Sequence, residues 1–399
     1  MTTQKRVIAV VFYILILMIE VNAQGAEART WINVGPVRGG AIFPDRSDPN
    51  RWYSFSYPAI YSTINGGRLW EKIPGPTTFG LTFHPFDATL YIAGRGSNPN
   101  EYSLLVSRDQ GRSFVRTGTF AWGLRLYTDP LNSNTLYQIG YQSRNLYRTT
   151  DLGRQWQQIT VSFTPSQTFG CSASAYSIID VLASPFEHNS VFASISLDNC
   201  PYVNNRRINV SFIVASRDGN TWKEEFVRKA APFRLFFDSA TPNRAYGYSE
   251  YGGQIVVLTR EGWQNFPEPP CPKRMHCGVQ IVAVVPRQSD QLVVVQKRYT
   301  GPDPDPAQSE FKICVTSNHG GDWTITDSPF TENLFFLYVS DTQPAYQLAA
   351  EGGNRGYGGY HYGGGIYRKD TDWQPANRGF EKTDPFLAYQ GRKTEPLCL

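Results

Sequence analysis

Short apolar stretches alternate with polar turns along almost the whole chain, and one order of stretches and turns recurs. A typical stretch is Asn145–Arg148, which leads into a turn containing Asp and Gly at Thr149–Trp156. Short runs bounded by Gly, Pro, Asn and Asp are typical of β-strands joined by tight turns. The pattern therefore predicts an all-β protein.

The turn itself is an octapeptide that recurs along the chain. It has Ser or Thr, then Asp or Asn, then Gly at alternate positions, and it closes on Trp or Phe. Besides Thr149–Trp156, three copies keep the whole pattern: Thr63–Trp70, Ser107–Phe114 and Thr316–Trp323. Three more are incomplete. Ser216–Trp222 is one residue short, Thr259–Phe266 lacks the Gly at its usual place, and Arg368–Trp373 keeps only Asp and Trp. Copies at regular long intervals indicate a repeat architecture.

A second repeat precedes each octapeptide. It has Pro after Asp, Ser or His, several polar residues, and an apolar–aromatic pair, as in Asp48–Tyr53, His84–Tyr91 and Asp129–Tyr137. Pro opens a turn and interrupts a strand. Each unit then contains an inner strand, a Pro turn, a second strand, a loop, a third strand, the octapeptide turn and an outer strand. We predict a β-propeller of seven four-stranded blades.

The octapeptide closely resembles the Asp box, or BNR repeat, and the chain looks like the WD-repeat/YVTN/BNR-like propeller superfamily. That group includes sialidases, xyloglucanases, sortilin-type receptor ectodomains and the photosystem II assembly factor. The resemblance covers essentially the whole predicted mature chain. It implies the architecture and is nearly silent on function.

We expect the octapeptide residues to be structural. The Asp or Asn side chain should accept hydrogen bonds from backbone N–H groups of the turn, Gly should supply a positive φ, and the aromatic ring should be buried. A Ca²⁺ loop is the alternative, but the spacing lacks the acidic density that it needs. No metal and no cofactor are expected. The residues assigned to this role are Asn65, Gly67, Trp70, Asp109, Gly111, Phe114, Asp151, Gly153, Trp156, Asp218, Trp222, Asn318, Gly320 and Trp323.

The first 23 residues differ from the array. Lys5 and Arg6 precede the apolar run Val7–Ile19, and Val21–Ala23 resembles a cleavage site. These features predict a signal peptide over 1–23, with an uncleaved anchor as the alternative, and one propeller domain over 24–399. The mature protein is expected to be secreted or periplasmic, without a membrane span, and monomeric. A net charge of +4 does not favour nucleic acid as a partner.

The cysteines fit an oxidising compartment. We expect Cys171 to pair with Cys200, because both lie in loops of blade 4 that project from one face, and Cys271 to pair with Cys277 within one loop. Cys314 and Cys398 remain as a third pair. Asn209 begins a glycosylation sequon, Asn-Val-Ser. We also expect Thr30–Val34 to close the ring by pairing near Tyr367–Gln374.

The long insertions and many arginines should share the face opposite the Asp-box turns, where propellers usually carry function. Arginines could bind an anionic ligand there, or could form ordinary local salt bridges. The tyrosines of the Gly-rich blade 7 loop could stack on sugars or bind a peptide, or simply pack on neighbouring loops. The ligand-binding candidates are Arg38, Arg125, Arg144, Arg234, Glu250, Arg298, Arg355, Tyr357, Tyr360 and His361, with Arg95, Arg206, Arg207 and Arg274 as further arginines of this face.

A non-enzymatic propeller that binds a protein or glycan ligand is the first functional hypothesis. A glycosidase needs converging carboxyls, and Ser54–Ala59, where xyloglucanases carry their first Asp, has no acid. Glu250 and Tyr251 are adjacent and would point to opposite faces of a strand. The alternative is a glycoside hydrolase, sialidase-like or xyloglucanase-like, which Arg38 and the aromatic loops favour. A structural assembly factor is a third possibility.

Overall fold

A computed structural model gives the fold of the chain. It describes residues 42–45, 48, 50–56, 59–74, 78–84, 89–95, 102–119, 125–140, 144–172, 174–184, 187–203, 206–237, 244–249, 253–259, 261–285, 291–300, 309–328, 330, 334–339, 347–351, 366–369 and 373–375. Every regular element in these residues is a β-strand, so the all-β prediction is confirmed.

Within the described residues the strands form seven four-stranded antiparallel sheets, numbered here in chain order, and one two-stranded hairpin. Sheet 1 contains β1 (Ile42–Pro44), β2 (Trp52–Ser56), β3 (Ala59–Thr63) and β4 (Glu71–Ile73). Sheet 2 contains β5 (Thr78–Phe83), β6 (Leu90–Arg95), β7 (Tyr102–Ser107) and β8 (Val115–Thr119). Sheet 3 contains β9 (Arg125–Asp129), β10 (Asn132–Ile139), β11 (Leu146–Thr149) and β12 (Gln157–Ile159).

Sheet 4 contains β13 (Tyr176–Ala183), β14 (Val191–Leu197), β17 (Ser211–Ser216) and β18 (Lys223–Arg228), and its middle loop holds the hairpin β15 (Tyr202–Val203) and β16 (Arg206–Arg207). Sheet 5 contains β19 (Phe233–Phe237), β20 (Ala245–Ser249), β21 (Ile255–Thr259) and β22 (Gly262–Phe266). Sheet 6 contains β23 (His276–Val284), β24 (Leu292–Tyr299), β25 (Ser309–Thr316) and β26 (Thr324–Asp327). Sheet 7 contains β27 (Leu334–Val339), β28 (Gln347–Glu351), β29 (Ile366–Lys369) and β30 (Trp373–Pro375).

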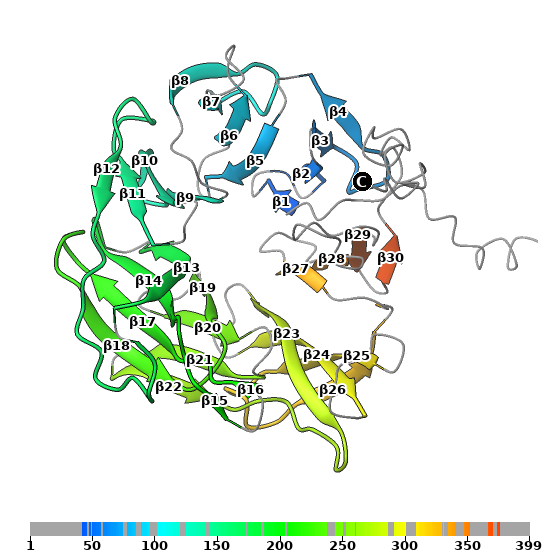
Figure 1. Cartoon of the computed structure of the whole chain (residues 1–399). Coiled ribbons are helices and arrows are strands. Elements are labelled where there is room, and N and C mark those ends of the chain that lie inside the picture. Colours follow the sequence, from blue (N-terminus) through cyan, green and yellow to red (C-terminus); the bar gives the residue numbers. More distant parts are fainter. Residues whose placement is uncertain are drawn as a thin grey trace, which may run out of the picture.

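The sheets stand around a central opening in chain order, as the blades of a propeller do (Figure 1). The first strand of each sheet faces the centre and the fourth strand faces outward (Figure 1). Neighbouring inner strands are in contact, for example β5 with β9, β13 with β19 and β23 with β27. The predicted propeller architecture is therefore present.

The Asp-box turns and the Pro turns lie together at one edge of the sheets, as the strand order predicted. The backbone N–H of Gly66 in the first box donates to the carbonyl of Asn50 in the first Pro turn, at 2.8 Å. In sheet 3 the N–H of Leu152 donates to the carbonyl of Asn134, at 3.1 Å. We call this side the turn face and the opposite side, where the inner strands begin, the loop face.

The hydrophobic core lies between consecutive sheets rather than within one. Between sheets 1 and 2 it includes Tyr53, Ile60 and Leu90, and between sheets 4 and 5 it includes Phe233 and Trp263. Full burial of one such side chain contributes about 1.5–3 kcal/mol. Each sheet is thus stabilised by packing on its neighbours.

Five Asp boxes share the hydrogen bond from the Ser or Thr hydroxyl to the Asp or Asn, and four of them share the full arrangement seen in the third box. In the third box Thr149 Oγ1 donates to Asp151 Oδ1 at 2.7 Å and accepts from the N–H of Gly153 at 2.8 Å, and Asp151 Oδ1 accepts from the N–H of Gln155 at 3.0 Å. Gly153 has a φ of 80°, which favours glycine. The same hydroxyl-to-Asp or hydroxyl-to-Asn bond joins Thr63 to Asn65, Ser107 to Asp109, Ser216 to Asp218 and Thr316 to Asn318. In all five turns the Asp or Asn side chain is therefore bonded within its own turn.

The aromatic residues of the second repeat join neighbouring sheets. The hydroxyl of Tyr53 in sheet 1 donates to the carbonyl of Gln110 in sheet 2 at 3.2 Å. The hydroxyl of Tyr91 in sheet 2 donates to the carbonyl of Ser133 in sheet 3 at 2.6 Å. The repeat therefore encodes contacts between sheets as well as the turn before them.

The fifth predicted Asp box is a different turn. Thr259 pairs directly with Gly262, so the two strands are joined by a tight hairpin, and β22 continues through Phe266. The usual Gly position is taken by Trp263, and Gly262, with a φ of 106°, stands one residue before it. In sheet 7 the fourth strand is β30, which pairs with β29; Thr30–Val34 lies outside the described residues.

Candidate functional site

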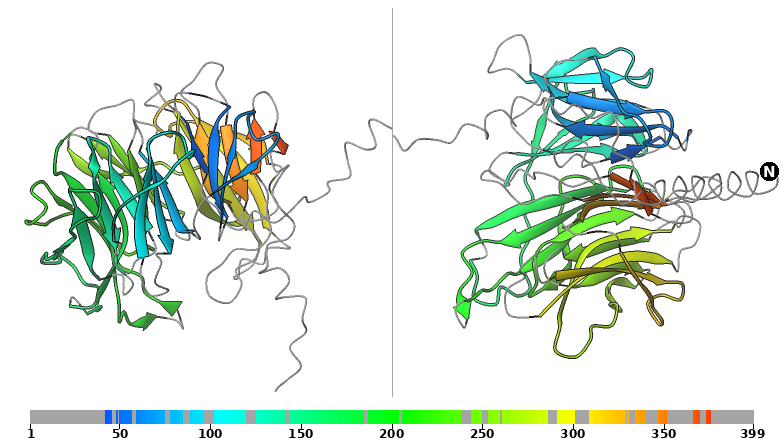
Figure 2. Two further views of the ribbon diagram at one scale, coloured as in Figure 1. Left: turned by 90° about the horizontal axis from the view of Figure 1, so that it is seen from above. Right: turned by 90° about the vertical axis from the view of Figure 1, so that its right-hand side faces the viewer.

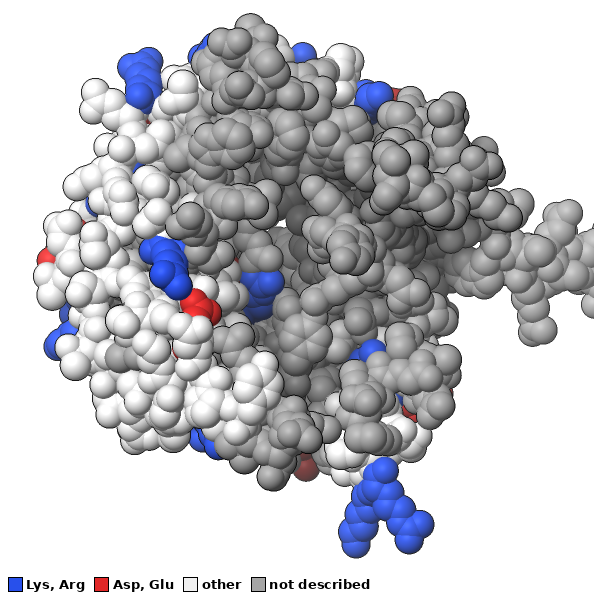
Figure 3. Space-filling model, viewed as in Figure 1, with Lys and Arg blue, Asp and Glu red and all other residues white. Residues whose placement is uncertain are grey.

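The loop face surrounds the central opening, and the molecule is hollowed there (Figure 3). A Lys or Arg side chain lies at the hollow, with a pair of opposite charges nearby (Figure 3). The cation at the hollow and the expected position of the inserted loops make this face the candidate site.

Two loops of sheet 4 are joined by the predicted disulfide between Cys171 and Cys200, with an S–S distance of 2.11 Å. The loop before β13 is also held by Glu224 of β18, whose carboxylate accepts from the N–H of Ser166 at 2.8 Å and from its hydroxyl at 2.6 Å. The N–H of Asp198 donates to the carbonyl of Ala175 at 2.7 Å. These bonds fix both loops to each other and to the sheet.

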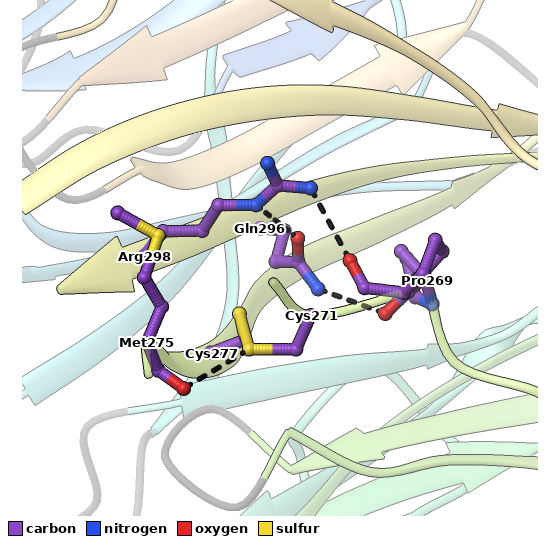
Figure 4. Close-up of a disulfide and its surroundings, with 7 residues drawn as sticks. Pro269, Cys271, Met275, Cys277, Gln296 and Arg298 are labelled. Atoms are coloured by element: carbon purple, nitrogen blue, oxygen red, sulfur yellow. Dashed lines mark hydrogen bonds between the residues drawn. A yellow bond between two sulfur atoms is a disulfide. The ribbon is translucent and has the colours of Figure 1, made fainter. Parts of the chain in front are cut away.

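The loop before β23 is closed by the second predicted disulfide, Cys271–Cys277 (Figure 4). Gln296 and Arg298 of β24 lie behind this loop, and their side chains donate to the carbonyls of Pro269, at 3.0 Å, and Pro270, at 3.3 Å. The two side chains are also joined, because Arg298 Nε donates to Gln296 Oε1 at 2.7 Å (Figure 4). They hold the loop in place.

Arg298 therefore differs from its prediction as a ligand-binding residue. It is only 7% exposed, and of its donors one bonds to the loop and one to Gln296. A long side chain on a second strand can turn inward under a loop, and no motif near Arg298 indicates this.

Arg144 and Arg234 lie on the loop face as predicted, and both have local partners. Arg144 is half exposed and forms an ion pair with Asp198 at 3.8 Å. Arg234 is half-buried on the inner strand β19, and its Nη1 lies 3.5 Å from the carbonyl of Ile179. A β-bulge in β13 between Ile178 and Asp180 includes that residue.

The other predicted residues of the site lie wholly or partly outside the described residues. For Arg125, Arg206 and Arg207 the structure describes the backbone, which lies in strands. Outside the described residues altogether are Arg38, Glu250, Arg355, Tyr357, Tyr360, His361 and Cys398.

Two acids of this region are engaged in bonds that stabilise the fold. Asp180 of β13 is 8% exposed, and its carboxylate accepts from the N–H of Leu235 in the next sheet at 3.0 Å and from the N–H of Val181 at 3.2 Å. Asp198 accepts from the hydroxyl of Ser177 at 3.0 Å in addition to its ion pair. Both carboxylates therefore join elements of the structure.

Glu268 was missed by the sequence reasoning. Desolvation raises the pKa of its carboxyl, although the charge of Arg228 opposes the shift. A raised pKa on the loop face is a property of candidate acid catalysts. The residue follows the strand β22 directly, and no motif marks it.

Phe169 and Tyr202 were also missed. They lie two residues from Cys171 and Cys200 and are 41% and 72% exposed. The sequence did carry a signal for them, namely aromatic residues beside two cysteines in inserted loops.

Cys314 does not form the predicted disulfide. It is a free thiol in β25 with 0% exposure, and burial raises its pKa to about 11. Sheet 6 is covered on both sides, so a terminal segment could not reach this sulfur without opening the core. The two disulfides that do form indicate an oxidising, extracytoplasmic compartment.

Asn209 of the sequon is exposed directly before β17. Within the described parts of the chain, no helix is long and apolar enough to span a membrane. The same parts contain no group of three or more His, Cys, Asp or Glu placed to hold a metal.

Comparison with known proteins agrees with the fold. No protein-family profile matches the chain. A xyloglucanase from Paenibacillus sp is 27% identical over 130 residues, which are 30% of this chain and 13% of that protein. The GH74 xyloglucanase from Xanthomonas campestris superposes with a TM-score of 0.59 and 15% identity, over 88% of this chain and 55% of that one.

YCF48 from Cyanidioschyzon merolae superposes with a TM-score of 0.51 and 15% identity, over 85% of this chain and 96% of that one. The chain thus spans about half of the xyloglucanase structure and a small part of the curated xyloglucanase. At these identities the likeness concerns the fold. Together with the five Asp boxes, it shows that the chain is a BNR/Asp-box β-propeller, similar in fold to GH74 xyloglucanases and to YCF48.

Proposed function

We propose that this protein is a non-enzymatic propeller that binds a protein or glycan ligand on its loop face, near the arginines. The observation that carries the proposal is the use of Asp180 and Asp198. Asp180 accepts two backbone N–H groups, and Asp198 pairs with Arg144 and Ser177. Glycosidases need two carboxyls about 5–10 Å apart that are available to substrate, whereas these two stabilise the scaffold.

Arg234 gives the proposed site its chemistry. It is half-buried on the inner strand β19, with its Nη1 3.5 Å from the carbonyl oxygen of Ile179. A guanidinium can bind a carboxylate or sulfate in a bidentate manner. We therefore expect ligands that carry anionic groups.

The proposal includes the architecture around the site. The seven sheets are the seven blades of a closed ring, and Thr30–Val34 joins the last blade. Removal of residues 1–23 as a signal peptide leaves one secreted or periplasmic domain over 24–399, monomeric and without a membrane span. Mass spectrometry of the secreted protein tests the cleavage, since an N-terminus other than residue 24 would contradict it.

The function is tested with an array of neutral and anionic glycans, together with sugar-release assays on sialosides, xyloglucan and other β-glucans. We expect binding without release. Arg234→Ala should weaken binding about tenfold, because charge-assisted hydrogen bonds contribute about 1.5–3 kcal/mol each. Release of sugar by the wild-type protein would refute the non-enzymatic reading.

A glycoside hydrolase is the second candidate, and the partial match to a Paenibacillus xyloglucanase favours it. Glu268, the exposed acid that follows β22, is the residue to test as its acid. If this candidate is correct, xyloglucan is cleaved and Glu268→Gln abolishes cleavage while thermal stability is retained. Cleavage that survives Glu268→Gln would exclude Glu268 from the chemistry.

A further inference from the structure

The two loops of sheet 4 that share the disulfide form a prominence on the molecule. It consists of residues 162–172 and 198–209, with 204 and 205 outside the description. The hairpin β15–β16, at its tip, stands clear of the seven sheets (Figure 2). We call this region the sheet-4 prominence.

The prominence is braced from several sides. Besides the Cys171–Cys200 disulfide and the bonds from Ser166 to Glu224, the ring of Phe163 packs on that of Phe212 with centroids 5.3 Å apart. The hairpin is closed by the N–H of Ile208, which donates to the carbonyl of Pro201 at 3.0 Å. Preorganised loops lose little conformational entropy on binding.

Two large side chains are exposed on this rigid frame, Phe169 at 41% and Tyr202 at 72%. Their segments touch, since a Cβ added to Gly170 would lie 3.4 Å from Pro201 Cγ. Phe169 has a φ of 52°. A bulky residue is uncommon in the left-handed region, and such conformations persist where the surroundings impose them, often at functional sites. The fold therefore exposes two aromatic rings on segments that touch each other.

The composition of the prominence is that of a protein-binding surface. Residues 162–175 contain no charged side chain, and residues 199–209 contain Arg206 and Arg207 but no acid. Two neighbouring acids have partners, since Asp198 is paired with Arg144 and Glu224 accepts from Ser166. Interfaces are enriched in aromatic residues and Arg and depleted in Lys and Glu, and binding loops of antibodies favour Tyr, Ser and Asn. The net positive charge complements an acidic partner.

We propose that the sheet-4 prominence is the docking surface for a folded protein whose contact surface has an apolar pocket edged by Asp and Glu. Small-molecule and sugar sites are concave, whereas this surface projects and needs a partner that encloses it. Tyr202 would fill the pocket and Arg206 and Arg207 would meet its acidic edge. The inference rests on the proposed binding function and names the partner class for one part of the loop face.

A phage-displayed library of random linear and cyclic peptides tests the proposal, because such peptides select the surfaces of a protein that are able to bind polypeptide. The library is selected on the full purified chain, and affinities are then measured for wild type, Tyr202→Ser, Phe169→Ser and Val115→Ser. Val115 is the matched control, since it is 64% exposed on β8 in sheet 2.

We expect selected peptides to combine Asp or Glu with apolar residues and to bind more weakly at high salt. Tyr202→Ser should weaken binding about tenfold or more, as loss of a central Tyr does at protein interfaces, Phe169→Ser should weaken it severalfold, and Val115→Ser should change nothing. Thermal melts show whether the variants fold; at 72% exposure Tyr202→Ser should leave the melting temperature unchanged.

Three outcomes would overturn the proposal: no selected peptide, selected peptides without acids, or affinities insensitive to Tyr202→Ser. A vesicle arm separates lipid from protein, because binding to vesicles of three parts POPC to one part POPG that Tyr202→Ser abolishes would assign the prominence to membranes instead. If ligand binding depends on Arg234 and not on Tyr202, the proposed function stands and this inference falls. If sugar is released, the proposed function falls, whatever the peptides show.

Discussion

Gly118 is the position where sheets 2 and 3 approach most closely among the glycines described. A Cβ built on it would lie 2.1 Å from the carbonyl oxygen of Gly153, 2.2 Å from the carbonyl carbon and 2.7 Å from the N of Arg154. All three atoms are backbone, so no side chain can rotate away. The change Gly118→Ala must therefore separate β8 from the Asp box of sheet 3.

That separation breaks two hydrogen bonds. The N–H of Thr119 donates to the carbonyl of Gly153 at 3.1 Å, and Trp156 Nε1 donates to the carbonyl of Thr119 at 2.9 Å. Each contributes about 1 kcal/mol, and overpacking adds about 1–3 kcal/mol. We expect a total loss of about 3–5 kcal/mol, a large part of the roughly 5–15 kcal/mol by which a domain is stable.

Thermal unfolding followed by tryptophan fluorescence measures the effect. Gly118→Ala should lower the melting temperature by several degrees. Gly278→Ala is the control, because a Cβ there meets nothing within 4 Å, and its effect should be within about 0.5 kcal/mol. Equal melting temperatures for the two variants would show that this close approach does not hold sheets 2 and 3 together.

Three further predictions concern single side chains. Hydrogen bonds from Ser113 and Ser107 lower the pKa of Asp109 to about 2, below its value in the unfolded chain. Its contribution to stability should therefore be present above about pH 4 and lost towards pH 2. Asp109→Asn should make the melting temperature less dependent on pH in this window, and an unchanged profile would show that Asp109 does not cause that dependence. Tyr91→Phe removes the hydrogen bond from the buried Tyr91 hydroxyl to the carbonyl of Ser133, so urea unfolding should show a loss of about 1 kcal/mol. A loss below about 0.3 kcal/mol would contradict the role of this hydroxyl. In a Cys398→Ser variant, Cys314 should not react with a thiol reagent at pH 8 until the protein is unfolded, because burial raises its pKa to about 11; rapid reaction of the folded protein would contradict its burial.

The repeat made most of the fold predictable from sequence. An Asp box is a local structure, in which Thr149, Asp151 and Gly153 bond to one another, so eight residues are enough to identify it. The strand order then follows, and it also placed Cys171 and Cys200 in loops on one face. The prediction of a fifth box was wrong because Thr259 pairs with Gly262 in a tight hairpin, which still joins the third and fourth strands of sheet 5.

The candidate site was less predictable because it depends on contacts between distant residues. Nothing near Arg298 in the sequence shows that it turns under the loop of Pro270, or that Gly118 lies against Gly153. Cys314 belongs to a strand covered on both sides, where alternation does not distinguish inside from outside. Such features follow from how sheets pack, which no short motif records.

The hydrogen bonds between sheets have a consequence for how the chain is synthesised. Tyr53 reaches 57 residues ahead, His84 45 and Tyr91 42, and Trp156 reaches 37 residues back. Every one of these partners is therefore made soon after, or before, the residue that needs it. Since domains form as the chain emerges and nearby contacts form fastest, each of these sheets can dock on the preceding one during translation.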